Sequence, residues 1–181
     1  SQIGTKKISG LFGLHPLPDF LFNTQYSDVD KVYAFNRVMK DVSMQEKPDV
    51  ILLGIPDSLL PLNNKHRFSF GLYAYEIFNA VQPDFVITSL MANNGYNDEF
   101  YSEISKMAKY KYNVNIDAYF VSQFCPLSNS IWSEKLSYVY LSRMELPKTE
   151  YKVYTTSDLN NDILFKQAEK KLLLYGKYEQ Y

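Results

Sequence analysis

Polar side chains of several kinds gather in one loop of this sequence. In "KPDVILLGIPDSLLPLNNK", residues 47–65, an apolar run ends at Ile55 and a polar segment follows. The segment supplies hydrogen-bond acceptors, donors and a cation just before a helix that we expect to begin at Gly71. Such a set suits an anionic or polar ligand. The candidate ligand-binding residues are Asp57, Ser58, Asn63, Asn64, Lys65 and His66.

A second polar loop, "SLMANNGYND" at residues 89–98, follows the next apolar run. Its candidate ligand-binding residues are Ser89, Asn93 and Asn94, and Asn94 with Gly95 predicts a turn. A competing interpretation applies to both loops. Asparagine before a helix commonly serves turn and capping chemistry, and Lys65 is equally consistent with a solvated surface cation.

Residues able to catalyse a reaction are sparse. The two histidines, His15 and His66, lie far apart in the sequence, and Cys125 is the single cysteine. A multi-cysteine metal site is therefore excluded, and no nucleophile with a neighbouring base is evident. Neither glycine-rich phosphate-binding motif occurs in the sequence. We predict no metal and no cofactor, and we assign no catalytic residue.

The stretch "GLFGLHPLPDFLFN", residues 10–23, is apolar but interrupted by glycine and proline. It is too irregular for a strand or a long helix. Two interpretations stay open: a loop that covers the core, or an apolar surface that docks a partner. The candidate docking residues are Leu11, Phe12, His15, Phe20 and Phe22.

Apolar periodicity predicts the elements that position these loops. Ser27 has the position of a helix N-cap, and Asn97 has a second one. The later segments at 136–144 and 151–156 alternate strictly, so we expect them to pair as an antiparallel edge around Pro147. The predicted helices begin after Ser27, at Gly71, after Asn97 and after Ser157, and the predicted strands lie in 48–55, 83–91 and 114–121.

This order of elements predicts a three-layer α/β/α sandwich with a mostly parallel sheet. The strand, helix and strand from residue 48 to residue 91 predict a βαβ crossover. Ligands of such sheets lie beyond the carboxyl ends of the strands, where the loops at 5–15, 56–70 and 89–97 fall. We expect one domain over residues 1–181. The opening "SQIGT" resembles the end of a strand, so we also expect a preceding β-α segment.

The composition limits the classes of partner and the cellular location expected for the chain. The chain has 181 residues, is 46% hydrophobic and carries a formal net charge of −1, with an isoelectric point near 6.1. This balance disfavours nucleic acid, which basic surfaces bind. The sequence has neither a membrane-length apolar run nor a signal-peptide pattern, and its lone cysteine fits a reducing compartment. We expect a soluble cytoplasmic protein.

Four segments resemble the clostridial peptide maturation system proteins, which are encoded beside a radical SAM maturase and a small ribosomally synthesised peptide. They are "SQIGTK", "LFGLHPLPDFLF", "KPDVILLGIPDSLLPLNNK" and "GLYAYEIFNAVQPDFVITSL". The resemblance covers about residues 1–125 and the closing "YGKYEQY". Family members often have Gly-Gly where Asp57 and Ser58 stand, so this chain departs at its polar loop. The resemblance implies a role in peptide maturation and no particular reaction.

A more distant likeness links the chain to dethiobiotin-synthetase-like P-loop domains, which implies a Rossmann-like or P-loop-like sheet. Three hypotheses follow. The chain is an accessory protein that binds a precursor peptide or the radical SAM maturase. Alternatively, it is a degenerate nucleotide- or phosphate-binding enzyme domain whose phosphate loop lies upstream of Ser1. The third hypothesis is a homo-oligomeric scaffold, which the many aromatic residues would suit.

Overall fold

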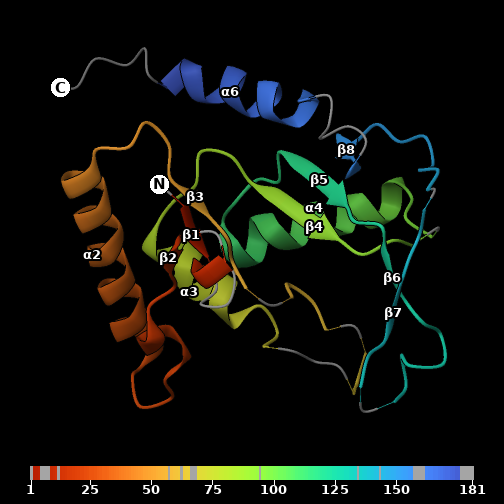
Figure 1. Cartoon of the computed structure of the whole chain (residues 1–181), viewed down its shortest axis with the longest axis horizontal. Helices are drawn as coiled ribbons and strands as arrows, with labels where there is room; N and C mark the ends of the chain where they lie inside the picture. Colours follow the sequence, from red (N-terminus) through yellow and green to blue (C-terminus); the bar gives the residue numbers. More distant parts are fainter. Residues whose placement is uncertain are drawn as a thin grey trace. The chain divides into compact units, whose positions relative to one another are not determined.

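A computed structural model describes residues 2–4, 9–11, 13–56, 58–61, 63–65, 69–93, 95–133, 135–142, 144–156 and 162–175. Contacts along the chain divide it into two compact units, Ser1–Gln82 and Pro83–Tyr181. Each unit is described by itself, and Figure 1 labels the elements of both. The single domain expected over residues 1–181 stays a prediction.

The sheet of the first unit has three short parallel strands in the order β2-β1-β3. These are β1 (Gln2–Gly4), β2 (His15–Pro16) and β3 (Leu52–Leu53). Ile3 of the central strand is opposite His15 on one side and Leu53 on the other. Because Ile3 is only 3% exposed, this strand forms the base of the first core.

The first unit also contains the helices η1 (Asp19–Phe22), α2 (Asp28–Glu46) and α3 (Leu72–Ala80). The predicted N-cap is confirmed, because the hydroxyl of Ser27 accepts a hydrogen bond from the amide of Asp30 at 3.2 Å. Helix α2 ends at Lys47, whose backbone is left-handed (φ 46°). Apolar residues from the sheet and all three helices then form one core, which contains Ile3, Leu17, Leu21, Phe35, Ile77 and Ala80.

The second unit contains another parallel sheet, in the order β4-β5-β8. Its strands are β4 (Ile87–Leu90), β5 (Ala118–Val121) and β8 (Val153–Tyr154). Helix α4 (Asp98–Tyr112) begins at the predicted cap, where the Asn97 side chain accepts from the Phe100 amide at 2.9 Å. Helix α6 (Ile163–Tyr175) follows β8 and buries Leu164. The predicted cap Ser157 lies outside the described residues.

Aromatic side chains dominate the core of the second unit. Tyr101 and Tyr119 are almost fully buried, and their rings lie 4.8 Å apart. The Tyr119 hydroxyl donates to the carbonyl of Tyr101 at 3.1 Å and lies 2.7 Å from the Ser105 hydroxyl. These bonds satisfy the polar end of a ring that is otherwise surrounded by apolar neighbours.

Two predicted strand pairings are wrong. The strands before and after α3 do not pair in a βαβ unit, because β3 pairs with β1 and β4 pairs with β5. The two late segments do not pair with each other either. Strand β7 (Tyr138–Tyr140) is antiparallel to β6 (Phe124–Pro126), and β8 is parallel to β5. The connection between β6 and β7 is held by the buried Ser130 hydroxyl, which donates to the carbonyl of Ser137 and accepts from its amide.

The chain is therefore a mixed α/β protein, in agreement with the predicted fold class, and its described strands pair mostly in parallel, with one antiparallel pair. Within the described part of the chain, every helix is too short or too polar to cross a membrane. The same residues contain no group of three histidine, cysteine, aspartate or glutamate side chains placed to hold a metal ion.

Candidate functional site: an aromatic hollow with a buried ion pair

The first unit has a surface hollow of about 390 Å³ between η1 and the first turns of α2 and α3. We call it the aromatic hollow. Its volume lies within the range of small-ligand sites. Rings and charged groups line it together, namely Phe22, Tyr26, Phe70 and Tyr73 with Asp28, Lys31 and Glu76. A second hollow of about 460 Å³ shares Tyr26 and Lys31 and adds Phe20, Asp30 and Ala34.

Local sequence signals build the walls of the aromatic hollow. Helix η1 ends at Phe22, and the chain turns at Asn23, whose side chain accepts from the amide of Gln25 at 2.9 Å. On the opposite wall, Phe70 and Gly71 both have left-handed backbones, with φ 53° and 76°. Glycine adopts this conformation freely, whereas at Phe70 it costs about 1–2 kcal/mol. The chain thus enters α3 through a turn that sets Phe70 beside the hollow.

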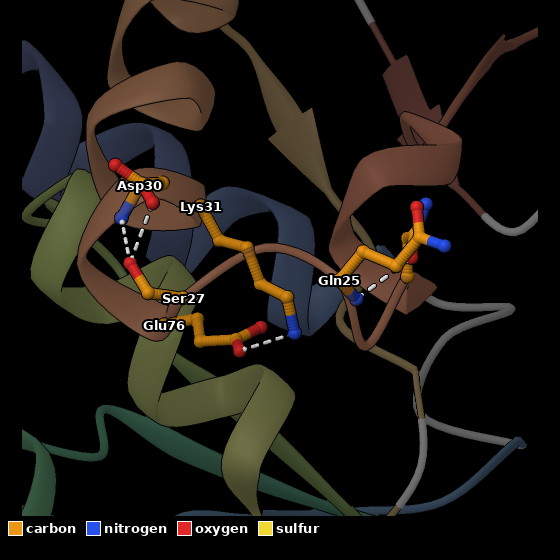
Figure 2. A network of polar contacts seen from close by, with 6 residues as sticks. Gln25, Ser27, Asp30, Lys31 and Glu76 are labelled. Carbon is orange, nitrogen blue, oxygen red and sulfur yellow. Dashed lines mark hydrogen bonds and ion pairs between the residues drawn. The ribbon is translucent and has the colours of Figure 1, made fainter.

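A buried ion pair joins the two helices that flank the aromatic hollow. The ammonium nitrogen of Lys31 lies 3.0 Å from Oε1 of Glu76, as Figure 2 shows. Lys31 is 8% exposed and Glu76 is 2% exposed. The other carboxylate oxygen, Oε2 of Glu76, is also buried and accepts no hydrogen bond from a described residue. An unsatisfied buried acceptor is uncommon in folded proteins, so this oxygen requires an explanation.

The electrostatics of Glu76 follow from its surroundings. Burial raises the pKa of its carboxyl above the ordinary value of 4.5, because the charged form loses hydration. Lys31 opposes this rise through its hydrogen bond and charge, whereas Asp28 adds to it through its charge and through a side-chain hydrogen bond. The ion pair therefore compensates only part of the desolvation of Glu76.

The aromatic rim of the hollow remains accessible. The rings of Phe22 and Tyr73 meet edge to face with centroids 5.1 Å apart, an arrangement that aromatic pairs prefer. Even so, Phe22 is 43% exposed and Tyr26 is 51% exposed. Large rings with this much free area offer a rigid apolar surface to a partner.

The predicted docking residues separate into two groups. Phe22 lines the aromatic hollow and Phe20 lines the adjoining one, so the structure places both beside a cavity. Leu11 is exposed and is not among the lining residues of either hollow, and Nε2 of His15 lies 2.8 Å from Oε1 of Glu46. Phe12 lies outside the described residues. Docking by these residues stays a prediction, and the first two have the geometry for it.

The predicted ligand-binding loop before α3 uses several of its polar groups in turns. The Ser58 hydroxyl accepts from the amide of Leu60 at 3.3 Å and donates to the carbonyl of the same residue. Asn63 accepts from the amide of Lys65 at 2.8 Å, and Asn64 is exposed beside it. These contacts agree with the turn interpretation, while Asp57 and His66 lie outside the described residues. Ligand binding by this loop stays a prediction.

The other predicted polar loop belongs to the second unit. Ser89 is exposed on β4, and the side chain of Asn93 accepts from the amide of Gly95 at 2.7 Å. Asn94 lies outside the described residues. The Asn93 side chain is thus used in a local contact with Gly95. The predicted turn at Asn94 and Gly95, and the proposed ligand contacts of this loop, stay predictions.

Sequence reasoning missed the charged residues of the aromatic hollow, because Lys31 and Glu76 lie inside predicted helices. One signal was available. Glu76 is the single charged residue in the apolar helix segment "GLYAYEIFNAVQ", where an unpaired charge would be costly. Such a residue needs a partner from elsewhere in the chain, although the segment does not identify Lys31 as that partner.

Comparisons of the chain with protein-family models, curated proteins and solved structures give no match. The candidate site is therefore characterised by its own geometry. It combines exposed rings, a buried ion pair and a buried acceptor oxygen, an arrangement suited to holding a ligand with apolar and hydrogen-bonding parts.

Proposed function

We propose that the chain is a cytoplasmic accessory protein that binds the precursor of a ribosomally synthesised peptide and acts with a radical SAM maturase. The resemblance described above suggests this pathway, and the aromatic hollow supplies a surface suited to the binding step. One observation carries the proposal: Phe22 and Tyr73 form a rigid, solvent-accessible aromatic pair at the rim of the hollow. Exposed aromatic anchors beside a cavity commonly contribute much of the affinity of a protein for a peptide.

The lining of the hollow favours binding over bond-making chemistry. Four aromatic side chains line it, and the ammonium group of Lys31 is paired with Oε1 of Glu76. An extended peptide can place an apolar side chain against the rings while its backbone follows the rim. This mode needs no cofactor and agrees with the absence of glycine-rich phosphate-binding motifs in the sequence.

Titration of the fluorescently labelled precursor peptide encoded beside the gene tests the proposal by anisotropy. We expect saturable binding that weakens about tenfold or more in Phe22→Ser, because the anchor loses most of its apolar area. The double variant Phe20→Ser with Phe22→Ser should bind more weakly still. Phe20 packs partly against the core, so circular dichroism must confirm that the double variant is folded. Tyr110→Ser is the control, because Tyr110 is 86% exposed on α4.

A thermal-shift series separates this function from the nucleotide hypothesis. Precursor peptide, Mg-ATP, Mg-GTP and S-adenosylmethionine are each added to the wild-type chain. A ligand at about 100 times its dissociation constant stabilises a protein by roughly 2.7 kcal/mol, which is easily detected. We expect a response to the peptide. A response to a nucleotide with none to the peptide would favour the enzyme-domain alternative and contradict our proposal.

A further inference from the structure

The buried acceptor of the aromatic hollow distinguishes it from a merely apolar depression. Glu76 lines the hollow and is 2% exposed, yet within the described structure its Oε2 accepts no hydrogen bond. Leaving such an acceptor unpaired is costly, and the cost disappears when a donor reaches it. A ligand that brings a donor into the hollow would therefore gain affinity from a group that is already positioned.

The charges around the hollow favour a donor group that carries a positive charge. Asp28 and Glu76 line the aromatic hollow, Asp30 lines the adjoining hollow, and Lys31 is the cation shared by both. Among the described lining residues, with all groups ionised, three carboxylates face one ammonium group. A cationic ligand would bring this cluster closer to neutrality, whereas an anionic ligand would increase the imbalance.

The rings suit a cation carried on an apolar stem. Phe22, Tyr26, Phe70 and Tyr73 present their rings around the same space. Aromatic faces attract cations, and they also pack against the methylene groups that lead to a charged end. A lysine side chain has both features, because its four-carbon stem ends in a compact ammonium group.

The geometry also favours ammonium over guanidinium. A guanidinium group binds a carboxylate best through two parallel hydrogen bonds to its two oxygens. Here Oε1 of Glu76 already accepts from Lys31 at 3.0 Å, which leaves Oε2 alone. An ammonium group needs only one oxygen of Glu76 and can direct its remaining donors to Asp28 or to water.

We propose that the aromatic hollow binds a lysine side chain of a peptide ligand, with its ammonium group donating to Oε2 of Glu76 and its stem packed between Phe22, Tyr26 and Tyr73. This inference rests on the proposed function for the peptide nature of the ligand. It adds the chemical class of side chain that the hollow recognises.

Four blocked tetrapeptides, acetylated and amidated at their ends, test the inference by calorimetric titration into the full chain. Each contains one phenylalanine followed by lysine, norleucine, Nε-acetyl-lysine or arginine. We expect the lysine peptide to bind about tenfold more tightly than the norleucine and acetyl-lysine peptides, as a charge-assisted hydrogen bond to a buried acceptor would produce. Equal affinities for lysine and norleucine, or tightest binding by arginine, would overturn the assignment.

Two variants locate the preference in the hollow. Glu76→Gln should abolish the selectivity for lysine, and persistence of that selectivity in folded protein would contradict the inference. Because Glu76→Gln leaves the Lys31 charge without its counter-ion and risks misfolding, Asp28→Asn provides a second test at an exposed position. We expect it to weaken lysine binding severalfold. The control is Asp41→Asn, an exposed position on the same helix, which should bind as wild type does.

The outcomes separate this inference from the proposed function. If the precursor peptide binds the wild-type chain but the tetrapeptides show no preference for lysine, the inference fails and the proposed function stands. If the lysine tetrapeptide binds selectively but the precursor peptide does not bind, the proposed function fails and the lysine-binding site stands.

Discussion

The Nζ atom of Lys31 and the Oε1 atom of Glu76 lie 3.0 Å apart in a buried contact between residues 45 positions apart in the sequence. The contact ties α2 to α3, as Figure 2 shows, and both residues line the aromatic hollow. Burying two charges costs several kcal/mol in lost hydration, which the pairing offsets only in part. The pair therefore contributes little net stability relative to an apolar contact, and we interpret it as a feature that positions the site.

The first prediction concerns removal of one partner of this pair. Lys31→Met leaves the Glu76 carboxylate buried without its counter-ion, and we expect the free energy of unfolding to fall by about 3–5 kcal/mol. The double variant Lys31→Met with Glu76→Leu removes both charges and should recover most of that loss. Urea denaturation followed by circular dichroism measures both values. A single variant as stable as wild type would show that the contact is not formed in solution.

The second prediction is a pH dependence due to Glu76. Burial raises the pKa of Glu76 in the folded state, opposed by Lys31 and reinforced by Asp28 on α2. Above pH 4.5 and up to that raised pKa, the folded state holds more protons than the unfolded state. The free energy of unfolding should therefore decrease as pH rises through this window, by at most about 1.4 kcal/mol per pH unit.

Glu76→Gln provides the reference for this measurement, because glutamine does not titrate. Urea midpoints of both proteins are compared at intervals from pH 4 to pH 7. As pH rises, the unfolding free energy of wild type should fall relative to that of Glu76→Gln. A difference that moves in the opposite direction would mean that Lys31 outweighs burial and lowers the pKa of Glu76.

The third prediction addresses the second link between α2 and α3. The Asn36 side-chain amide donates to the carbonyl of Ala80 at 2.6 Å, and Ala80 is the last residue of α3. Carbonyls at a helix end lack partners within the helix, so this bond acts as a C-terminal cap. Asn36→Ala should lower the free energy of unfolding by about 1 kcal/mol. Arg37→Ala, at the adjacent exposed position, is the control and should be nearly neutral.

The fourth prediction concerns tyrosine ionisation in the second unit. Burial raises the pKa of Tyr96 to about 12, and the nearby Tyr101 contributes to the rise. Burial also raises the pKa of Tyr101 and of Tyr119. Ultraviolet titration at alkaline pH should show a fraction of tyrosines that ionises late. That fraction should shrink in Tyr96→Phe, and an unchanged titration curve would contradict the burial of this ring.

The sequence by itself determined the structural features that depend on residues close to one another in the chain. Ser27 and Asn97 were identifiable as caps because each bonds to an amide three positions later. Alternation of helical and apolar segments likewise indicated the α/β class. The turn at Asn93 and Gly95 is also local, since its hydrogen bond spans two residues. Signals of this range are contained in the local sequence and need no information from the rest of the fold.

Tertiary structure decided which segments meet. Strand β8 pairs with β5 rather than with β7, and Lys31 finds Glu76 on another helix. These pairings depend on how many segments distant in the sequence pack together. A short strand such as Val153–Tyr154 contains too few residues to specify its own register. The sequence marked Phe20 and Phe22 as candidates for docking. Only the tertiary structure placed Phe22 in the same hollow as the buried carboxylate of Glu76, because Glu76 lies more than fifty residues further along the chain.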